Sequence, residues 1–329
     1  MQFNEFCARI CDDIKVSFEN QGIPVTRVDI HKVVKNNGHN LTALMIQQEN
    51  INVTPTIYLE PYYDRYTHGV LYEDVIAEVE RFYMKAVPSQ DFDISNVINF
   101  DVAKDNIVYT LVNYDKNTEF LKSVPYKQIE DLALIYKILL PENDLYGEMA
   151  TISINNNLFN LYNVSVEELH EIAEENMKRL LPGKVRHITD LLEGFAVPWI
   201  ENIEMYAVSN EKNIMGAASI LEPEIMDALA KNFGNTYYVI PSSIHEVLVV
   251  SENMAKDKNM QKMIAEVNGS QLWPDEILGD KPYIVDAVEH KLILAERKEE
   301  YFKEKELQKQ KQEKLQEEEK TMNVKGPKL

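Results

Sequence analysis

The densest group of side chains able to do chemistry lies in residues 241–246, Pro-Ser-Ser-Ile-His-Glu, between two apolar runs. It combines two hydroxyls, an imidazole and a carboxylate. A serine becomes a nucleophile when a base lies within hydrogen-bond reach and amide donors stabilise the oxyanion. Ser243, His245 and Glu246 are therefore the candidates for a hydrolase-type or small-ligand enzyme site.

The spacing within this turn favours a structural role. Neighbours in an extended chain alternate faces, so Ser243 and His245 share a face while Glu246 points away from both. The sequence also lacks a Gly-x-Ser-x-Gly nucleophile elbow. We favour a turn in which Pro241 bends the chain and a serine caps it, while His245 and Glu246 secure neighbouring backbone. Catalysis and ligand or partner binding remain the alternatives.

Tyrosines form a second group of interest around residues 58–72. Tyrosine rings pack while their hydroxyls stay wet, and protein interfaces are rich in them. Tyr62, Tyr63 and Tyr66 are therefore candidate binding residues. Packing at the edge of a core is the favoured alternative, because half-buried tyrosines are common.

Metal and cofactor chemistry have little support in the sequence. There is no His-Glu-x-x-His motif, no cysteine pair with zinc spacing, no P-loop and no Gly-x-Gly-x-x-Gly. We predict no metal and no cofactor. The only cysteines, Cys7 and Cys11, share one face of an apolar helical pattern, which favours reduced core thiols in a reducing compartment.

The formal net charge of −20 over 329 residues makes nucleic-acid binding unlikely, because such a surface repels phosphate. It suits a basic protein partner or simple solubility. No apolar run approaches the roughly 20 residues that span a bilayer, and the first residues lack the basic start and apolar core of a signal peptide. We therefore expect an acidic cytoplasmic protein with no membrane association.

The elements that position these groups alternate between helices and local hairpins. Apolar spacing predicts a helix over residues 2–21 that ends at Gly22. Two strands, 25–34 and 41–47, flank the turn Asn36-Asn37-Gly38, and an amphipathic helix follows over 70–84. This order favours an α+β fold with mixed or antiparallel sheets over a doubly wound sheet.

Later segments continue the alternation. Residues 126–139 are strongly apolar and predict a central helix, while Ser165 and Glu168 form a capping box for a helix that runs to about Leu180. The charged residues 296–329 predict a helical tail that becomes disordered. The expected domains are an N-terminal lobe (1–89), a larger lobe (90–295) with the polar turn, and the tail (296–329).

Several phrases together resemble a bacterial family known only as domain-of-unknown-function family 5688. They cover roughly residues 1–295 and are the following: Tyr58-Leu59-Glu60-Pro61-Tyr62-Tyr63, Val108-Tyr109, Leu111-Val112-Asn113-Tyr114, Asp131-Leu132-Ala133, Ala150-Thr151-Ile152, Asn176-Met177, Met205-Tyr206-Ala207-Val208-Ser209-Asn210, Gly216-Ala217-Ala218, and the 241–246 turn. Ile240 and Ala207 stand where leucine is expected in the family.

The resemblance implies a protein of Gram-positive gut bacteria, often among mobile-element cargo, with no assigned activity. Together with the acidic surface and the missing catalytic signatures, it favours a non-enzymatic interaction or accessory protein. The alternative function is an enzyme that uses Ser243, His245 and Glu246.

Overall fold

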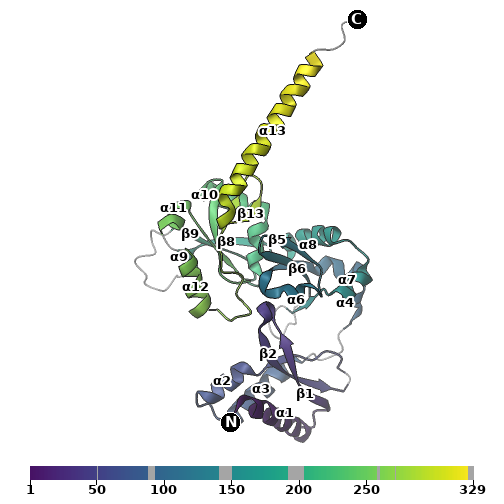
Figure 1. Cartoon of the computed structure of the whole chain (residues 1–329). Helices are drawn as coiled ribbons and strands as arrows, with labels where there is room; N and C mark the ends of the chain where they lie inside the picture. The colour runs from purple at the N-terminus through teal and green to yellow at the C-terminus, as the bar shows by residue number, and fades with distance from the viewer. Residues whose placement is uncertain are drawn as a thin grey trace. The chain divides into compact units, whose positions relative to one another are not determined.

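The computed structural model describes residues 1–49, 51–87, 93–140, 150–191, 204–257, 260–270 and 272–324 (Figure 1). The chain forms two compact units. The first contains residues 1–127, 134–180 and 273–276; the second contains 128–133, 181–272 and 277–329. The boundary expected at residues 89 and 90 lies outside the described residues.

The first unit begins with a helix and a long hairpin. Helix α1 (Phe3–Asn20) is followed by strands β1 (Val25–Val34) and β2 (Asn40–Gln48), which pair antiparallel, and β3 (Thr56–Tyr58) extends the sheet to three strands. The 3-10 turn η1 (Asn36–Gly38) connects β1 and β2, with Asn37 at φ 59°. The predicted hairpin and first helix are confirmed, and Gly22 lies beyond the helix at φ 72°.

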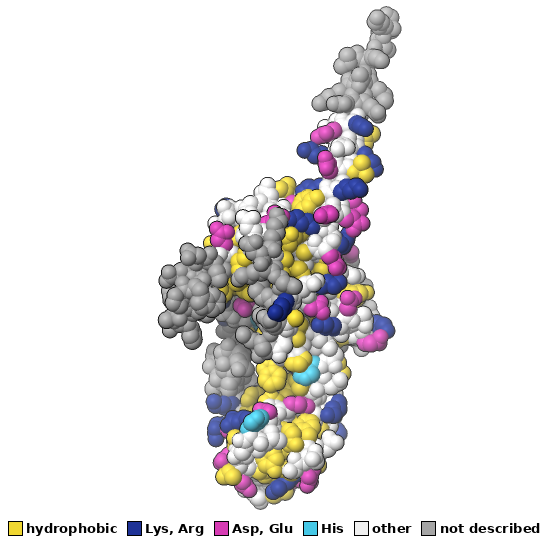
Figure 2. Space-filling view, turned by 60° about the vertical axis from the view of Figure 1, so that its left-hand side comes forward, with side chains coloured by type: hydrophobic (Ala, Val, Ile, Leu, Met, Phe, Trp, Pro, Cys, Tyr) yellow, Lys and Arg dark blue, Asp and Glu magenta, His cyan; other side chains and the backbone are white. Residues whose placement is uncertain are grey.

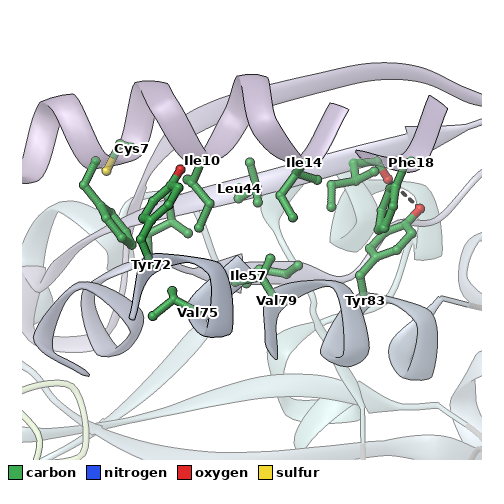
Figure 3. Close-up of a cluster of buried hydrophobic side chains, with 13 residues drawn as sticks. Cys7, Ile10, Ile14, Phe18, Leu44, Ile57, Tyr72, Val75, Val79 and Tyr83 are labelled. Carbon is green, nitrogen blue, oxygen red and sulfur yellow. Dashed lines mark hydrogen bonds between the residues drawn. The ribbon is translucent and has the colours of Figure 1, made fainter. Parts of the chain in front are cut away.

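Two further helices, α2 (Glu60–Thr67) and α3 (Tyr72–Ala86), complete this part of the unit. Side chains from α1, α3, β2 and β3 converge into one buried cluster (Figure 3). Within it, the Tyr83 hydroxyl donates a hydrogen bond to the carbonyl of Ile46 at 2.9 Å. Each fully buried isoleucine or leucine stabilises such a core by about 1.5–3 kcal/mol.

The predicted helix over 126–139 is wrong, because these residues form a hairpin in a second, four-stranded sheet. Strand β5 (Tyr126–Ile129) turns at Glu130, at φ 53°, into β6 (Leu132–Leu139). Strand β4 (Ile107–Asn113) and the short β7 (Thr151–Ser153) also pair with β6. Both faces of β6 are buried, so its sequence lacks the alternation that marks a half-exposed strand.

Helix α8 (Val166–Leu180) begins at the predicted capping box. The Ser165 hydroxyl accepts the N–H of Glu168, and the Glu168 carboxylate accepts the N–H of Ser165. The remaining short elements of this unit are α4 (Ser95–Ile98), α5 (Phe100–Ala103), η2 (Lys104–Asn106), η3 (Asp115–Asn117), α6 (Thr118–Leu121) and α7 (Asn156–Tyr162).

The second unit is built on a six-stranded sheet of order β13-β12-β10-β11-β9-β8, with antiparallel ladders. Its strands are β8 (Gly183–His187), β9 (Met205–Asn210), β10 (Thr236–Pro241), β11 (Val247–Val250), β12 (Tyr283–Asp286) and β13 (Lys291–Leu294). Its helical segments are α9 (Ile188–Leu191), η4 (Gly216–Leu221), α10 (Pro223–Phe233), α11 (Glu252–Asp257) and α12 (Met260–Ser270).

After the turn η5 (Ala295–Arg297) comes helix α13 (Lys298–Val324), which carries mixed acidic and basic side chains over residues 298–316 (Figure 2). The helical tail is confirmed; residues 325–329, where disorder was expected, lie outside the described range. The protein is thus α+β, with antiparallel ladders, packed helices and a charged C-terminal helix, as predicted.

Candidate functional site

The structure brings Ser243 and His245 together in the turn between β10 and β11. The Ser243 hydroxyl accepts the backbone N–H of His245 at 3.1 Å, and the Ser243 N–H donates to the carbonyl of Glu246 at 3.0 Å. The His245 ring accepts a bond at Nδ1 from the N–H of Met215, also at 3.1 Å. Each of these side-chain atoms therefore serves a backbone amide, as a structural turn requires.

The segment after β9 forms the other half of this arrangement. The buried Asn210 side chain accepts the N–H groups of Lys212 and Ile214 and donates to the carbonyl of Ile214. A Cβ added to Gly216 would lie 2.3 Å from Ser209 Oγ and 2.7 Å from the His245 carbonyl oxygen. This contact leaves no room for a side chain, so the glycine allows the two turns to approach each other.

The tyrosine candidates lie in the first unit, on α2. Tyr63 and Tyr66 belong to an aromatic cluster with Phe3 and Phe6: the ring centroids are 5.0 Å apart for Phe3–Tyr63 and 5.7 Å for Phe6–Tyr66. All three candidate tyrosines are partly buried, as a role at the core edge requires. Burial, followed by the nearby charge of Glu78, raises the pKa of the Tyr62 hydroxyl.

A pocket of about 270 Å³ opens beside this cluster, and Phe3, Glu60, Tyr63, Asp64 and Thr67 line it. We call it the α2 pocket. Glu60 and Asp64 are spaced one helical turn apart on α2, so both carboxylates lie on the face that carries the aromatic rings. Of the three tyrosine candidates, the pocket lining includes Tyr63 alone among the residues that the structure describes.

Glu60 is the least solvated acid of the pocket. Its Oε1 accepts the N–H of Thr42 at 2.7 Å, while its buried Oε2 accepts no hydrogen bond from the described residues. A carboxylate oxygen without a donor in a low-dielectric site attracts a cation strongly. Burial, followed by the negative charge of Glu60, raises the pKa of the Cys7 thiol.

A cation of the chain itself lies near the Phe3 ring. Lys32 Nζ lies 5.7 Å from the Phe3 ring centroid and donates to Thr42 Oγ1 at 2.6 Å. This geometry is typical of a cation–π contact. Among the described residues no three metal-ligating side chains form a group, so the paired carboxylates match an organic cation better than a metal ion.

The comparisons place the chain in a family. The model of a family of unknown function, DUF5688, matches residues 3–286. The chain belongs to DUF5688. The resemblance predicted from the sequence is thereby confirmed. No curated protein and no solved structure matches the chain.

Three of the phrases by which the sequence resembles DUF5688 meet in the second unit. These are the 205–210 strand, the 216–218 segment and the 241–246 turn, which the Met215–His245 and Ser209–His245 bonds join. The DUF5688 phrase at 58–63 lies in the first unit and supplies Glu60 and Tyr63 to the α2 pocket. In this chain, four of the family's phrases therefore contribute to one structural junction and one pocket.

Sequence reasoning missed Phe3, Glu60, Asp64 and Thr67 as pocket residues. The four-residue spacing of the two acids around Tyr63 is the signal that predicts a shared helical face. The contribution of Phe3 has no such signal, because packing of α1 beside α2 brings it there. No helix among the described residues has the length and apolar character needed to cross a membrane.

Proposed function

We propose that this DUF5688 protein is an interaction protein that binds a lysine or arginine side chain of a protein partner in the α2 pocket. The observation that carries this function is the pair of acids, Glu60 and Asp64, in a pocket lined by the rings of Phe3 and Tyr63. Aromatic faces and carboxylates are the groups that recognise organic cations.

The size of the pocket supports a single side chain as its occupant. A volume of about 270 Å³ is below the range of about 300–1,000 Å³ that drug-sized ligands occupy. A lysine or arginine side chain can lay its alkyl stem along the Phe3–Tyr63 edge and direct its charge to Glu60 and Asp64.

One such contact is weak, since an exposed cation–π contact contributes about 0.5–1 kcal/mol. The net charge of −20 adds long-range attraction that raises the association rate of a basic partner. We therefore expect a partner with several basic residues, bound with an affinity that falls as salt increases.

The experiment compares capture of native-cell proteins by the wild type and by the double variant Glu60→Gln, Asp64→Asn. Glutamine can still accept the N–H of Thr42, so the fold is preserved while both pocket charges are removed. The matched control is Glu73→Gln, Asp74→Asn, which removes two exposed acids from α3.

The wild type and the α3 control should retain a reproducible basic partner that the pocket variant loses. A short synthetic peptide containing lysine and arginine should also perturb the Tyr63 ring resonances in the wild type. If all three proteins capture the partner equally, or if added salt leaves the binding unchanged, the proposal is wrong.

A further inference from the structure

Strand β6 in the first unit carries a lysine at a position where the rest of the strand is buried and apolar. Lys137 is its one partly exposed residue. The preceding Tyr136 meets His170 of α8, with ring centroids 6.3 Å apart. Since strand neighbours point to opposite faces, Lys137 lies on the face away from α8.

The partner of Lys137 is a neutral hydroxyl. Lys137 pairs with Ser153 in the β6–β7 ladder, and its Nζ lies 3.1 Å from Ser153 Oγ. No carboxylate among the described residues lies within ion-pair distance of this amine. Burying an ammonium ion without a counter-charge is unfavourable, so the neutral amine is favoured.

A second lysine affects the pKa of the Lys137 amine. Burial, and then the positive charge of Lys35, lower the pKa of Lys137. Lys35 makes a cation–π contact with Tyr58, in which its Nζ lies 4.3 Å from the ring centroid. Burial beside another cation is the combination that converts a lysine into a nucleophile.

The same face of the sheet carries a further hydroxyl. Tyr109 of β4 stacks on His170, so the adjacent Thr110 points to the face of Lys137. Thr110 is 2% exposed, and its Oγ1 has no hydrogen-bond partner among the described residues. A buried hydroxyl of this kind costs free energy unless a water or ligand atom bonds to it.

We propose that Lys137 is a nucleophilic lysine that captures a small aldehyde or ketone as an imine, with Ser153 as its proton-transfer partner. This inference concerns a site separate from the α2 pocket and does not depend on the proposed function.

The chemistry balances without a redox partner. The neutral Nζ attacks the carbonyl carbon, and the C=O electron pair moves to oxygen. A proton passes from nitrogen to that oxygen, which gives a carbinolamine. Loss of one water then forms the C=N bond, and Ser153 lies where its hydroxyl can pass the proton between the two atoms.

The test uses the folded full chain and formaldehyde with cyanoborohydride, which reduces each imine to a stable amine. Mass spectrometry then gives the labelling rate of each lysine between pH 6 and 9. At pH 7, Lys137 should be labelled faster than the exposed Lys122, because a lowered pKa leaves a larger fraction of the amine neutral.

One variant and a denatured control separate this site from ordinary reactivity. Lys35→Gln should slow the labelling of Lys137 at pH 7 and shift its pH profile upward, because a neighbouring cation is removed. Lys137 and Ser153 are not among the residues that line the α2 pocket, so failure of this proposal is distinct from failure of the α2 pocket. In urea, Lys137 and Lys122 should be labelled at equal rates.

Labelling of folded Lys137 no faster than that of Lys122, or a rate insensitive to Lys35→Gln, overturns the proposal. In folded Ser153→Ala, Lys137 should still be labelled, but loss of water from the carbinolamine should be slower. The labelled fraction of Lys137 should therefore require a longer exposure to formaldehyde to reach the wild-type value. An unchanged time course in that variant removes Ser153 from the mechanism.

Discussion

The backbone N–H of Met215 donates to His245 Nδ1 across 3.1 Å and so joins the turn after β9 to the turn between β10 and β11. Met215 has φ 56°, in the left-handed region. The lone pair on Nδ1, with which a general base would accept a proton, therefore accepts a hydrogen bond from this amide. The remaining ring nitrogen carries the proton in the neutral form.

Replacing His245 by alanine should destabilise the second unit by about 1–3 kcal/mol, because the Met215 amide loses its acceptor in a partly buried site. The measurement is urea-induced unfolding. His245→Asn is the matched variant, since its Oδ1 takes the place of Nδ1 and should recover much of the loss. Wild-type stability in His245→Ala would contradict the structural role.

Glycine substitutions at two positions should change stability in opposite directions. Gly216→Ala places a Cβ 2.6 Å from the backbone nitrogen of Asn210 and should cost about 1–3 kcal/mol. Gly269→Ala meets nothing within 4 Å in α12 and should stabilise by about 0.5–1 kcal/mol. Thermal unfolding of both variants measures this, and a tolerated Gly216→Ala would show that the turns can separate.

The second unit should lose stability in alkali because of Tyr283. Its hydroxyl donates to Asp131 at 2.5 Å, and burial, with the Asp131 charge, raises its pKa well above the ordinary value. The folded state thus keeps the phenol neutral, while the unfolded chain ionises near pH 10. Stability should fall above about pH 10 by about 1.4 kcal/mol per pH unit for this group.

Unfolding of the wild type and Tyr283→Phe between pH 8 and 11.5 checks this slope. Tyr283→Phe should have a lower free energy of unfolding at neutral pH. In alkali its free energy of unfolding should fall less steeply with pH than that of the wild type, by the contribution of one proton. Parallel pH profiles would show that Tyr283 ionises as easily in the folded as in the unfolded protein.

Asp286 should hold the start of α13 to the sheet of the second unit. Burial opposes its ionisation, but hydrogen bonds from Lys305 and Tyr301 outweigh burial and lower its pKa. Asp286→Asn should therefore cost about 1–3 kcal/mol and increase proteolysis within residues 298–310. Because the folded pKa is lowered, this stabilisation is present above the ordinary value of about 3.9 and is lost as the pH falls below it.

The control for this prediction is Glu304→Gln, which removes an exposed acid from the same helix. It should leave both the proteolysis pattern and the acid transition near those of the wild type. If Asp286→Asn and Glu304→Gln behave alike, the carboxylate of Asp286 does not anchor α13.

Local signals in the sequence predicted several elements correctly. The capping box at Ser165 and Glu168, the turn at Asn37-Gly38 and the helix stop at Gly22 each depend on residues a few positions apart. The 126–139 segment failed for the same reason. Its residues 132–139 are apolar except for Lys137, a pattern that fits a buried helix as well as a buried strand, and pairing with β4, β5 and β7 makes them a strand.

For the candidate sites, sequence alone determined which groups were available: Ser243 and His245 in one turn, and Glu60, Tyr63 and Asp64 within five residues of one another. Only the tertiary structure decided what those groups contact. Met215 occupies the imidazole, Phe3 closes the α2 pocket, and Ser153 meets Lys137. These partners are separated along the chain, and no periodicity encodes such contacts, because packing between elements alone determines them.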